Sequence, residues 1–276
     1  MIQKNLNWTS KDGLRFFAHT WQPDGTPKAV ITLVHGLGEH CLRYTPYFEL
    51  FVKEGFAILG FDVRGHGQTE GKRGTIASYN ALLDDIDTAL QKTKELFADT
   101  PQFIYGHSMG GNLALNYLLR RQPNIKGGII TSPWLTLADE PNVVLKALVS
   151  ALKSVIPNAT IDSGLKIEHI STIENEVEKY RNDPLNHGRI SFRLFNEIAN
   201  SGLWAIKNSH KLKNPTLILH GTDDKITSAQ ASKQAAENNK EKIELIEWDK
   251  CYHELHNDIK RQEVAQAVID WINKHL

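Results

Sequence analysis

The sequence predicts an α/β fold with a mostly parallel central sheet flanked by helices. Short, continuously apolar runs recur along the chain, which is typical of strands buried on both faces of a parallel sheet. Helical patterns separate these runs, and such alternation indicates parallel strands joined by helices. Most of the unusual polar residues directly follow an apolar run. In open α/β sheets, ligands bind at those strand ends.

The chain opens with a predicted hairpin. Residues 6–8 and 14–18 flank Ser10-Lys11-Asp12-Gly13, a turn whose Asp-Gly pair favours positive φ. Their alternation predicts antiparallel, half-exposed strands. The runs that predict buried strands lie at 29–34, 57–61, 103–105, 128–130, 216–219 and 243–248, and the helical patterns lie at 78–98, 109–121, 228–238 and 258–274.

The alternation breaks between about residues 133 and 207. This stretch has no clear buried strand, and we expect helices and loops. The interruption predicts a helical cap, 133–207, inserted into a core made of residues 1–132 and 208–276. The first helix of the cap, over about 142–156, is apolar around most of its circumference.

Composition sets limits on partners and compartment. The 276 residues suit one large domain, or one domain with an insertion. The chain has 32 basic residues (Lys and Arg) and 32 acidic residues (Asp and Glu), so its formal net charge is zero. This balance gives no reason to expect nucleic acid as a partner. Cys41 and Cys251 are expected to be free thiols. Residues 1–5 lack an apolar signal core, and no apolar run approaches the ~20 residues that span a bilayer. We therefore expect a cytoplasmic protein.

A glycine-rich turn carries the first catalytic candidate. Gly106-His107-Ser108-Met109-Gly110 matches G-x-S-x-G between a predicted strand and a predicted helix. Glycines on both sides let strand and helix approach closely while the serine is exposed at the edge of the sheet. The helix N-terminus places free N–H groups near a developing oxyanion. The pattern predicts that Ser108 is the nucleophile of an α/β-hydrolase fold.

The serine hydroxyl requires a base, and the base requires an orienting acid. In this fold the acid and then the histidine follow the serine along the chain. Asp223 and Asp224 come after the strand at 216–219, and His253 and His256 come after the last strand. Position alone leaves the two acids open, whereas His253 is favoured as the base because it lies nearer to the strand end.

The motifs together resemble those of the monoacylglycerol lipase and lysophospholipase-like family of α/β-hydrolases, the serine aminopeptidase S33 type. The matching segments are His35-Gly36-Leu37-Gly38-Glu39-His40, Arg43-Tyr44, Asp62-Val63-Arg64-Gly65-His66-Gly67, the serine turn with Gly111, Ser132-Pro133, Gly221-Thr222-Asp223-Asp224-Lys225-Ile226 and Tyr252-His253-Glu254-Leu255-His256. They occur in the order found in the family and are spread over most of the chain.

The resemblance implies roles for individual residues. It makes Asp224 the catalytic acid, and it places the oxyanion hole at the backbone N–H groups of Leu37 and Met109. It also implies that Glu39, Arg43 and His256 bind the glycerol head group. For Glu39 and Arg43, an ordinary surface salt bridge without a ligand is an equally good interpretation.

The expected activity is hydrolysis of a carboxylic ester through an acyl-enzyme, without cofactor or metal. The resemblance implies monoacylglycerols or lysophospholipids as substrates. The alternatives are a short-chain carboxylesterase or thioesterase of the same fold, and a hydrolase-fold protein that only binds a ligand. Leu148 and Leu152 of the cap are expected to line an acyl pocket or to dock the helix on the core. Transient membrane contact through this helix is a third role.

Overall fold

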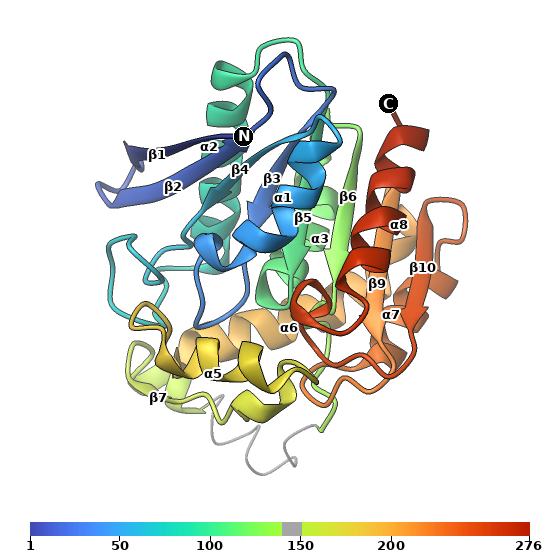
Figure 1. Ribbon diagram of the computed structural model, residues 1–276. Coiled ribbons are helices and arrows are strands. Elements are labelled where there is room, and N and C mark those ends of the chain that lie inside the picture. The colour runs from blue at the N-terminus through green and yellow to red at the C-terminus, as the bar shows by residue number, and fades with distance from the viewer. Residues whose placement is uncertain (140–150) are drawn as a thin grey trace.

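The computed structural model describes residues 1–139 and 151–276 and confirms the α/β fold class. Its main sheet has eight strands in the order β1-β2-β4-β3-β5-β6-β9-β10 (Figure 1). The strands are β1 (Ile2–Thr9), β2 (Arg15–Gln22), β3 (Val30–Val34), β4 (Ala57–Phe61), β5 (Gln102–His107), β6 (Gly127–Thr131), β9 (Thr216–Gly221) and β10 (Ile243–Trp248). The pairs β1–β2 and β2–β4 are antiparallel, and all other pairs in this sheet are parallel.

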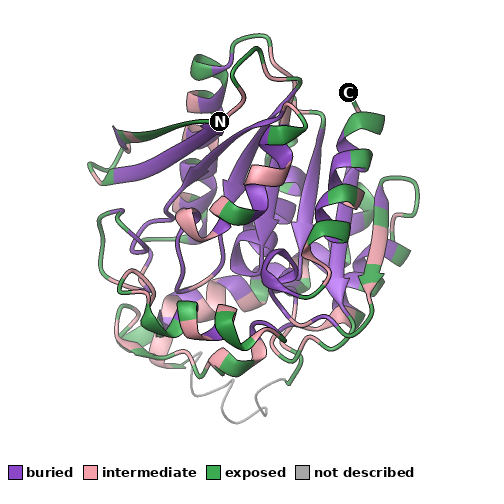
Figure 2. Cartoon of the chain, viewed as in Figure 1, coloured by how far each residue is buried: buried purple, intermediate pink, exposed green. Residues whose placement is uncertain are grey.

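Helices cover both faces of the sheet (Figure 1). On one face, α1 (Thr45–Lys53) and α8 (Arg261–Lys274) share an apolar core with the strands. On the other face, a second core joins α2 (Tyr79–Leu96), α3 (Met109–Arg121), α6 (Phe192–Asn208) and α7 (Ala229–Glu237). Figure 2 shows the central strands buried between these layers. This burial accounts for the continuous apolar runs in the sequence.

Two expectations for the N-terminal part of the chain need correction. The hairpin forms in the predicted place, but only β1 is largely exposed, whereas β2 is mostly buried. The reason is that β2 lies inside the sheet, between β1 and β4, and its side chains enter both apolar cores, Phe16 and Ala18 one and Phe17 and Trp21 the other. Helix α1 did not stand out in the sequence, although its buried Tyr47, Phe48 and Phe51 have helical spacing.

The segment expected to contain only helices and loops also contains strands. β7 (Thr160–Asp162) and β8 (Arg189–Ser191) form a two-stranded antiparallel sheet, and α5 (Glu174–Asn182) lies between them in sequence. Helix α6 packs on α3, where Asn112 Nδ2 donates to the Ile198 carbonyl at 3.0 Å. Most of the helix predicted over 142–156, including Leu148, lies outside the described residues.

Two further observations concern the thiols and the bilayer. Cys41 and Cys251 are both free and buried, as expected. In the described ranges 1–139 and 151–276, no helix is both long enough and apolar enough to cross a membrane.

Candidate active site

Ser108 lies on a sharp turn between β5 and α3. Its backbone has φ 55° and ψ −116°, a conformation that a non-glycine residue rarely adopts. The turn is tight: a Cβ on Gly106 would lie 2.4 Å from the Gly110 carbonyl oxygen, and one on Gly110 would lie 2.0 Å from that of Val34. The two glycines therefore allow the close packing that holds Ser108 in this strained conformation.

The structure brings Ser108, His253 and Asp224 together. His253 Nε2 lies 2.8 Å from Ser108 Oγ, and His253 Nδ1 lies 2.7 Å from Asp224 Oδ2. Asp223 is exposed and its side chain accepts a hydrogen bond from Thr222. His256 lies in a short 3-10 helix, η4 (Leu255–Asn257), and is fully buried. Of the two acids, Asp224 is therefore the one in contact with a histidine beside Ser108, and of the two histidines, His253 is the one in contact with Ser108.

The Asp224 carboxylate contacts several other groups in addition to His253. Its Oδ1 accepts hydrogen bonds from the backbone N–H groups of Ile226 and Thr227, at 2.8 and 3.0 Å. A second histidine, His220, places Nε2 3.1 Å from Oδ2, while its Nδ1 lies 2.8 Å from Ser232 Oγ. Burial raises the pKa of the Asp224 carboxyl, but His253 and His220 hold that pKa well below its usual range.

The charge of Asp224 also acts on the base. Burial lowers the pKa of His253, and the Asp224 carboxylate outweighs this effect, so the net pKa lies above the ordinary histidine value. The neighbouring His107 has its ring centre 4.8 Å from that of His253. Burial and the proximity of His253 hold the pKa of His107 well below its usual value, so His107 is neutral beside the base.

The two proposed oxyanion donors come from different segments of the chain. Met109 begins α3, and Leu37 lies in the loop after β3 and lines the cavity. Among the described residues, neither backbone N–H has a hydrogen-bond acceptor. The preceding N–H, that of Gly36, donates to Glu39 Oε1 at 2.6 Å. Both N–H groups are therefore free to donate to a ligand oxygen, as an oxyanion hole requires.

The three predicted head-group residues occupy different environments. Glu39 lines the cavity, whereas Arg43 and His256 are not among its lining residues. Arg43 does pair with Glu39, but the pair is buried, so the surface salt bridge considered above is wrong. Arg43 also bonds Glu254, a partner the sequence did not reveal. Burial lowers the pKa of His256 to about 4, so its ring is neutral at pH 7.

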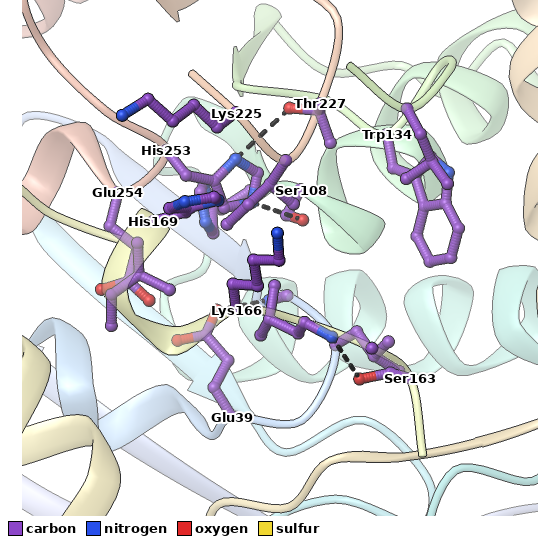
Figure 3. A pocket seen from close by; sticks show the side chains of 18 of the residues that line it. Glu39, Ser108, Trp134, Ser163, Lys166, His169, Lys225, Thr227, His253 and Glu254 are labelled. Atoms are coloured by element: carbon purple, nitrogen blue, oxygen red, sulfur yellow. Dashed lines mark hydrogen bonds between the residues drawn. The ribbon is translucent and has the colours of Figure 1, made fainter. Parts of the chain in front are cut away.

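A cavity of about 470 Å³ opens above Ser108. Figure 3 shows Ser108 beside His253, with Trp134 on one side and Glu254 on the other. Most of the lining residues could not be assigned from the sequence. The apolar part consists of Leu37, Trp134, Leu137, Leu165, Ile170, Phe195 and Ile226, and the polar part includes Ser163, Lys166, His169 and Lys225. Trp134, Lys225 and Ile226 carry a usable sequence signal, because they lie in or next to motif segments that follow strand ends.

One cluster of possible metal ligands occurs among the described residues. Oxygen and nitrogen atoms of Glu39, Glu254 and His256 lie within 4.8 Å of one another. Arg43 already donates to both carboxylates and supplies the positive charge between them. This geometry favours an ion pair there rather than a metal centre.

Comparison with known proteins places the chain in a family. The sequence profile described as serine aminopeptidase, S33, matches residues 25–260. An uncharacterized abhydrolase domain-containing protein of Dictyostelium discoideum is 34% identical over 99% of this chain, which spans only 29% of that protein. Phospholipase YtpA of Bacillus subtilis is 31% identical, with 93% of this chain and 99% of that protein aligned.

A solved structure agrees over the full length. The crystal structure of Paleococcus ferrophilus monoacylglycerol lipase has a TM-score of 0.85, with 29% identity and 100% of both chains covered. The chain therefore belongs to the serine aminopeptidase S33 family of α/β-hydrolases. Within that family it is a carboxylic ester hydrolase related to the monoacylglycerol lipases.

Proposed function

We propose that the protein hydrolyses single-chain acyl esters, namely monoacylglycerols or lysophospholipids, on a Ser108–His253–Asp224 triad. The observation that carries the proposal is the hydrogen-bonded triad at a cavity of about 470 Å³ with a mostly apolar lining. Such a volume lies in the range of small-molecule sites, and the apolar lining suits one acyl chain. The name of the Paleococcus ferrophilus monoacylglycerol lipase supports monoacylglycerols as substrates, and that of phospholipase YtpA supports a phospholipid ester.

The first half-reaction forms the acyl-enzyme. His253 Nε2 accepts the proton of Ser108 as Oγ attacks the ester carbonyl carbon. The carbonyl oxygen becomes an oxyanion and accepts hydrogen bonds from the backbone N–H groups of Leu37 and Met109. The intermediate collapses by breaking the bond to the alcohol oxygen, and His253 returns the proton to the departing alcohol. Asp224 stabilises the imidazolium throughout.

Water completes the cycle by the same route. His253 removes a proton from a water molecule, whose oxygen attacks the acyl carbon held on Ser108. The second tetrahedral intermediate releases the fatty acid and returns the proton to Ser108 Oγ. The residues present suffice for each proton transfer, since one base serves both halves.

Segment 133–207 acts as the cap in this proposal. Its residues Trp134, Leu165, Lys166 and Phe195 lie on the cavity, so the segment forms part of the acyl pocket. Contact of the cap with a membrane during substrate loading and a cytoplasmic location belong to the same proposal.

A fluorophosphonate probe and a substrate panel test the function. We expect the probe to label the wild type and Ser132→Ala, but not Ser108→Ala. Ser132 is a matched control, because its hydroxyl has no hydrogen-bond partner in the described part of the chain and Ser132 is not among the lining residues of the cavity. The panel contains monoacylglycerols, lysophosphatidylcholines, and p-nitrophenyl esters and acyl thioesters of varied chain length. Turnover restricted to short chains would instead indicate a short-chain esterase, and preference for thioesters a thioesterase. A wild type that is neither labelled nor active would indicate a ligand-binding protein.

A further inference from the structure

We infer that Glu39, Arg43 and Glu254 form a buried ionic cluster that positions the oxyanion loop relative to the catalytic base. This role rests on the proposed function and extends it to positioning residues. The cluster connects segments that are far apart in sequence. One lies just after β3, beside Leu37, and the other lies beside His253.

Arg43 lies at the centre of the cluster. Its Nη1 is 2.5 Å from Glu39 Oε2 and 2.8 Å from Glu254 Oε1, and its Nη2 is 2.7 Å from Glu254 Oε2. The exposed fraction of the Arg43 side chain is 8%, and those of Glu39 and Glu254 are both 3%. The ring of Tyr180 lies 4.5 Å from the guanidinium carbon. Bidentate geometry and burial fix all three side chains.

At one end, Glu39 controls the loop that carries Leu37. Glu39 Oε1 accepts the Gly36 N–H at 2.6 Å and the Tyr44 hydroxyl at 2.8 Å. The loop at Gly36 packs against Ser108, because a Cβ on Gly36 would lie 3.3 Å from Ser108 Cβ. A shift of Glu39 would therefore reorient the peptide groups next to the Leu37 N–H.

At the other end, Glu254 is the immediate neighbour of His253. Residues 249–254 form no regular helix or strand, so the histidine depends on contacts for its position. The Glu254 backbone N–H donates to the Ile170 carbonyl at 2.7 Å, and its carboxylate accepts from Asn257 Nδ2 at 2.9 Å as well as from Arg43. Arg43 therefore fixes the loop of the base and the loop of the oxyanion donor to each other.

The cluster is suited to positioning rather than to binding the head group. Glu39 and Glu254 line the cavity, but each of their carboxylate oxygens already accepts a hydrogen bond from the protein, and Arg43, which joins them, is not among the lining residues. Burial opposes ionisation of Glu254, but Arg43 outweighs it and lowers the pKa of that carboxyl to about 2. Burial lowers the pKa of Arg43, but nearby Glu254 and Glu39 outweigh this effect and keep that pKa well above its usual value, so the Arg43–Glu254 pair keeps its charges over the pH range in which the base titrates.

The test uses p-nitrophenyl acetate, which has no glycerol head group and no long chain. We expect Arg43→Met to lower kcat on this ester about 100-fold, with KM changed less than about threefold, because small displacements of catalytic groups cost rates of this order. Arg43→Lys should recover part of the loss. Glu254→Gln, which removes one buried carboxylate and keeps an acceptor, should lower kcat about 10-fold and remain folded if Arg43→Met does not.

The matched control is Arg64→Lys. Arg64 forms another buried ion pair, with Nε 2.6 Å from Asp85 Oδ2, and does not line the cavity. The Arg64→Lys substitution should lower the melting temperature of the protein without lowering kcat on p-nitrophenyl acetate. Head-group binding would leave acetate turnover intact and raise KM for monoacylglycerol alone, which would overturn the inference. An unchanged kcat in an Arg43→Met or Glu254→Gln variant that remains folded would also overturn the inference. Failure of the proposed function is distinct, because the wild type itself would then be inactive.

Discussion

The carboxylate of Asp224 accepts hydrogen bonds from two backbone N–H groups and lies against two histidine rings. This residue-scale environment keeps it ionised while it raises the pKa of His253. The base must be neutral to accept the proton from Ser108. Activity should therefore be present above the pKa of His253 and be lost as pH falls through it. Because that pKa is raised, the loss should begin at a higher pH than for an ordinary histidine.

Asp224→Asn tests this electrostatic coupling. Removal of the charge should lower the His253 pKa and move the acid limb of the kcat/KM profile to lower pH. The rate should fall about 10⁴-fold, because the imidazolium loses its partner and the tautomer is no longer fixed. The measurement is a pH–rate profile with p-nitrophenyl acetate. Asp223→Asn is the control, since that exposed neighbour bonds Thr222 and should behave like the wild type.

Residues in local motifs could be identified from the sequence, whereas their long-range partners could not. Ser108 lies directly after β5 and His253 lies in the loop after β10, and the structure brings both side chains together with Asp224. The contact between Arg43 and Glu254 joins positions 211 residues apart. No local periodicity encodes such a pair, so the sequence left Arg43 as a head-group or surface residue.

At the scale of elements, the approach of α3 to β3 depends on Gly110. Its missing side chain makes room for the Val34 and His35 carbonyl oxygens, which a Cβ would approach to 2.0 and 2.5 Å. Gly110→Ala should therefore lower the free energy of unfolding by about 3 kcal/mol, the range of strained core substitutions. Urea unfolding measures this change. Gly25→Ala is the control, because no atom lies within 4 Å of its Cβ position.

β3, β4, β5, β6 and β9 were predicted well because their apolar runs are continuous. The run at 243–248 was predicted to be buried as well, but β10 is an edge strand and is mostly half-buried or exposed. The sequence could not reveal that β2 is buried, since its burial depends on its place beside β4 and on helices from later parts of the chain that cover both of its faces. β7 and β8 are only three residues each, too short for a period-2 pattern to appear. Helix α6 was assigned to the cap, yet several of its side chains belong to the core shared with α2 and α3.

At the scale of the whole molecule, the cavity is shared between the loops of the core and the segment 133–207. Leu37 comes from the core loop after β3, and Leu165 comes from the loop between β7 and the 3-10 helix η2 (Ile167–His169). The two parts also bond directly: the His187 N–H donates to the Gly38 carbonyl at 2.9 Å, and His40 Nε2 lies 2.8 Å from Asp183 Oδ2. Residues of the cavity wall that are remote from Ser108 should therefore determine how kcat/KM depends on the length of the acyl chain.

Leu165→Asp provides the corresponding test. A charge on the cavity wall should lower kcat/KM for long-chain monoacylglycerols and p-nitrophenyl esters about 10-fold or more, since each buried methylene contributes about 0.8 kcal/mol. Turnover of p-nitrophenyl acetate should change less than about threefold, because its acyl group ends near Ser108. Leu203→Asp, on an exposed position of α6 outside the cavity, should alter neither. Equal losses on long and short esters would show that Leu165 supports the fold rather than the acyl pocket.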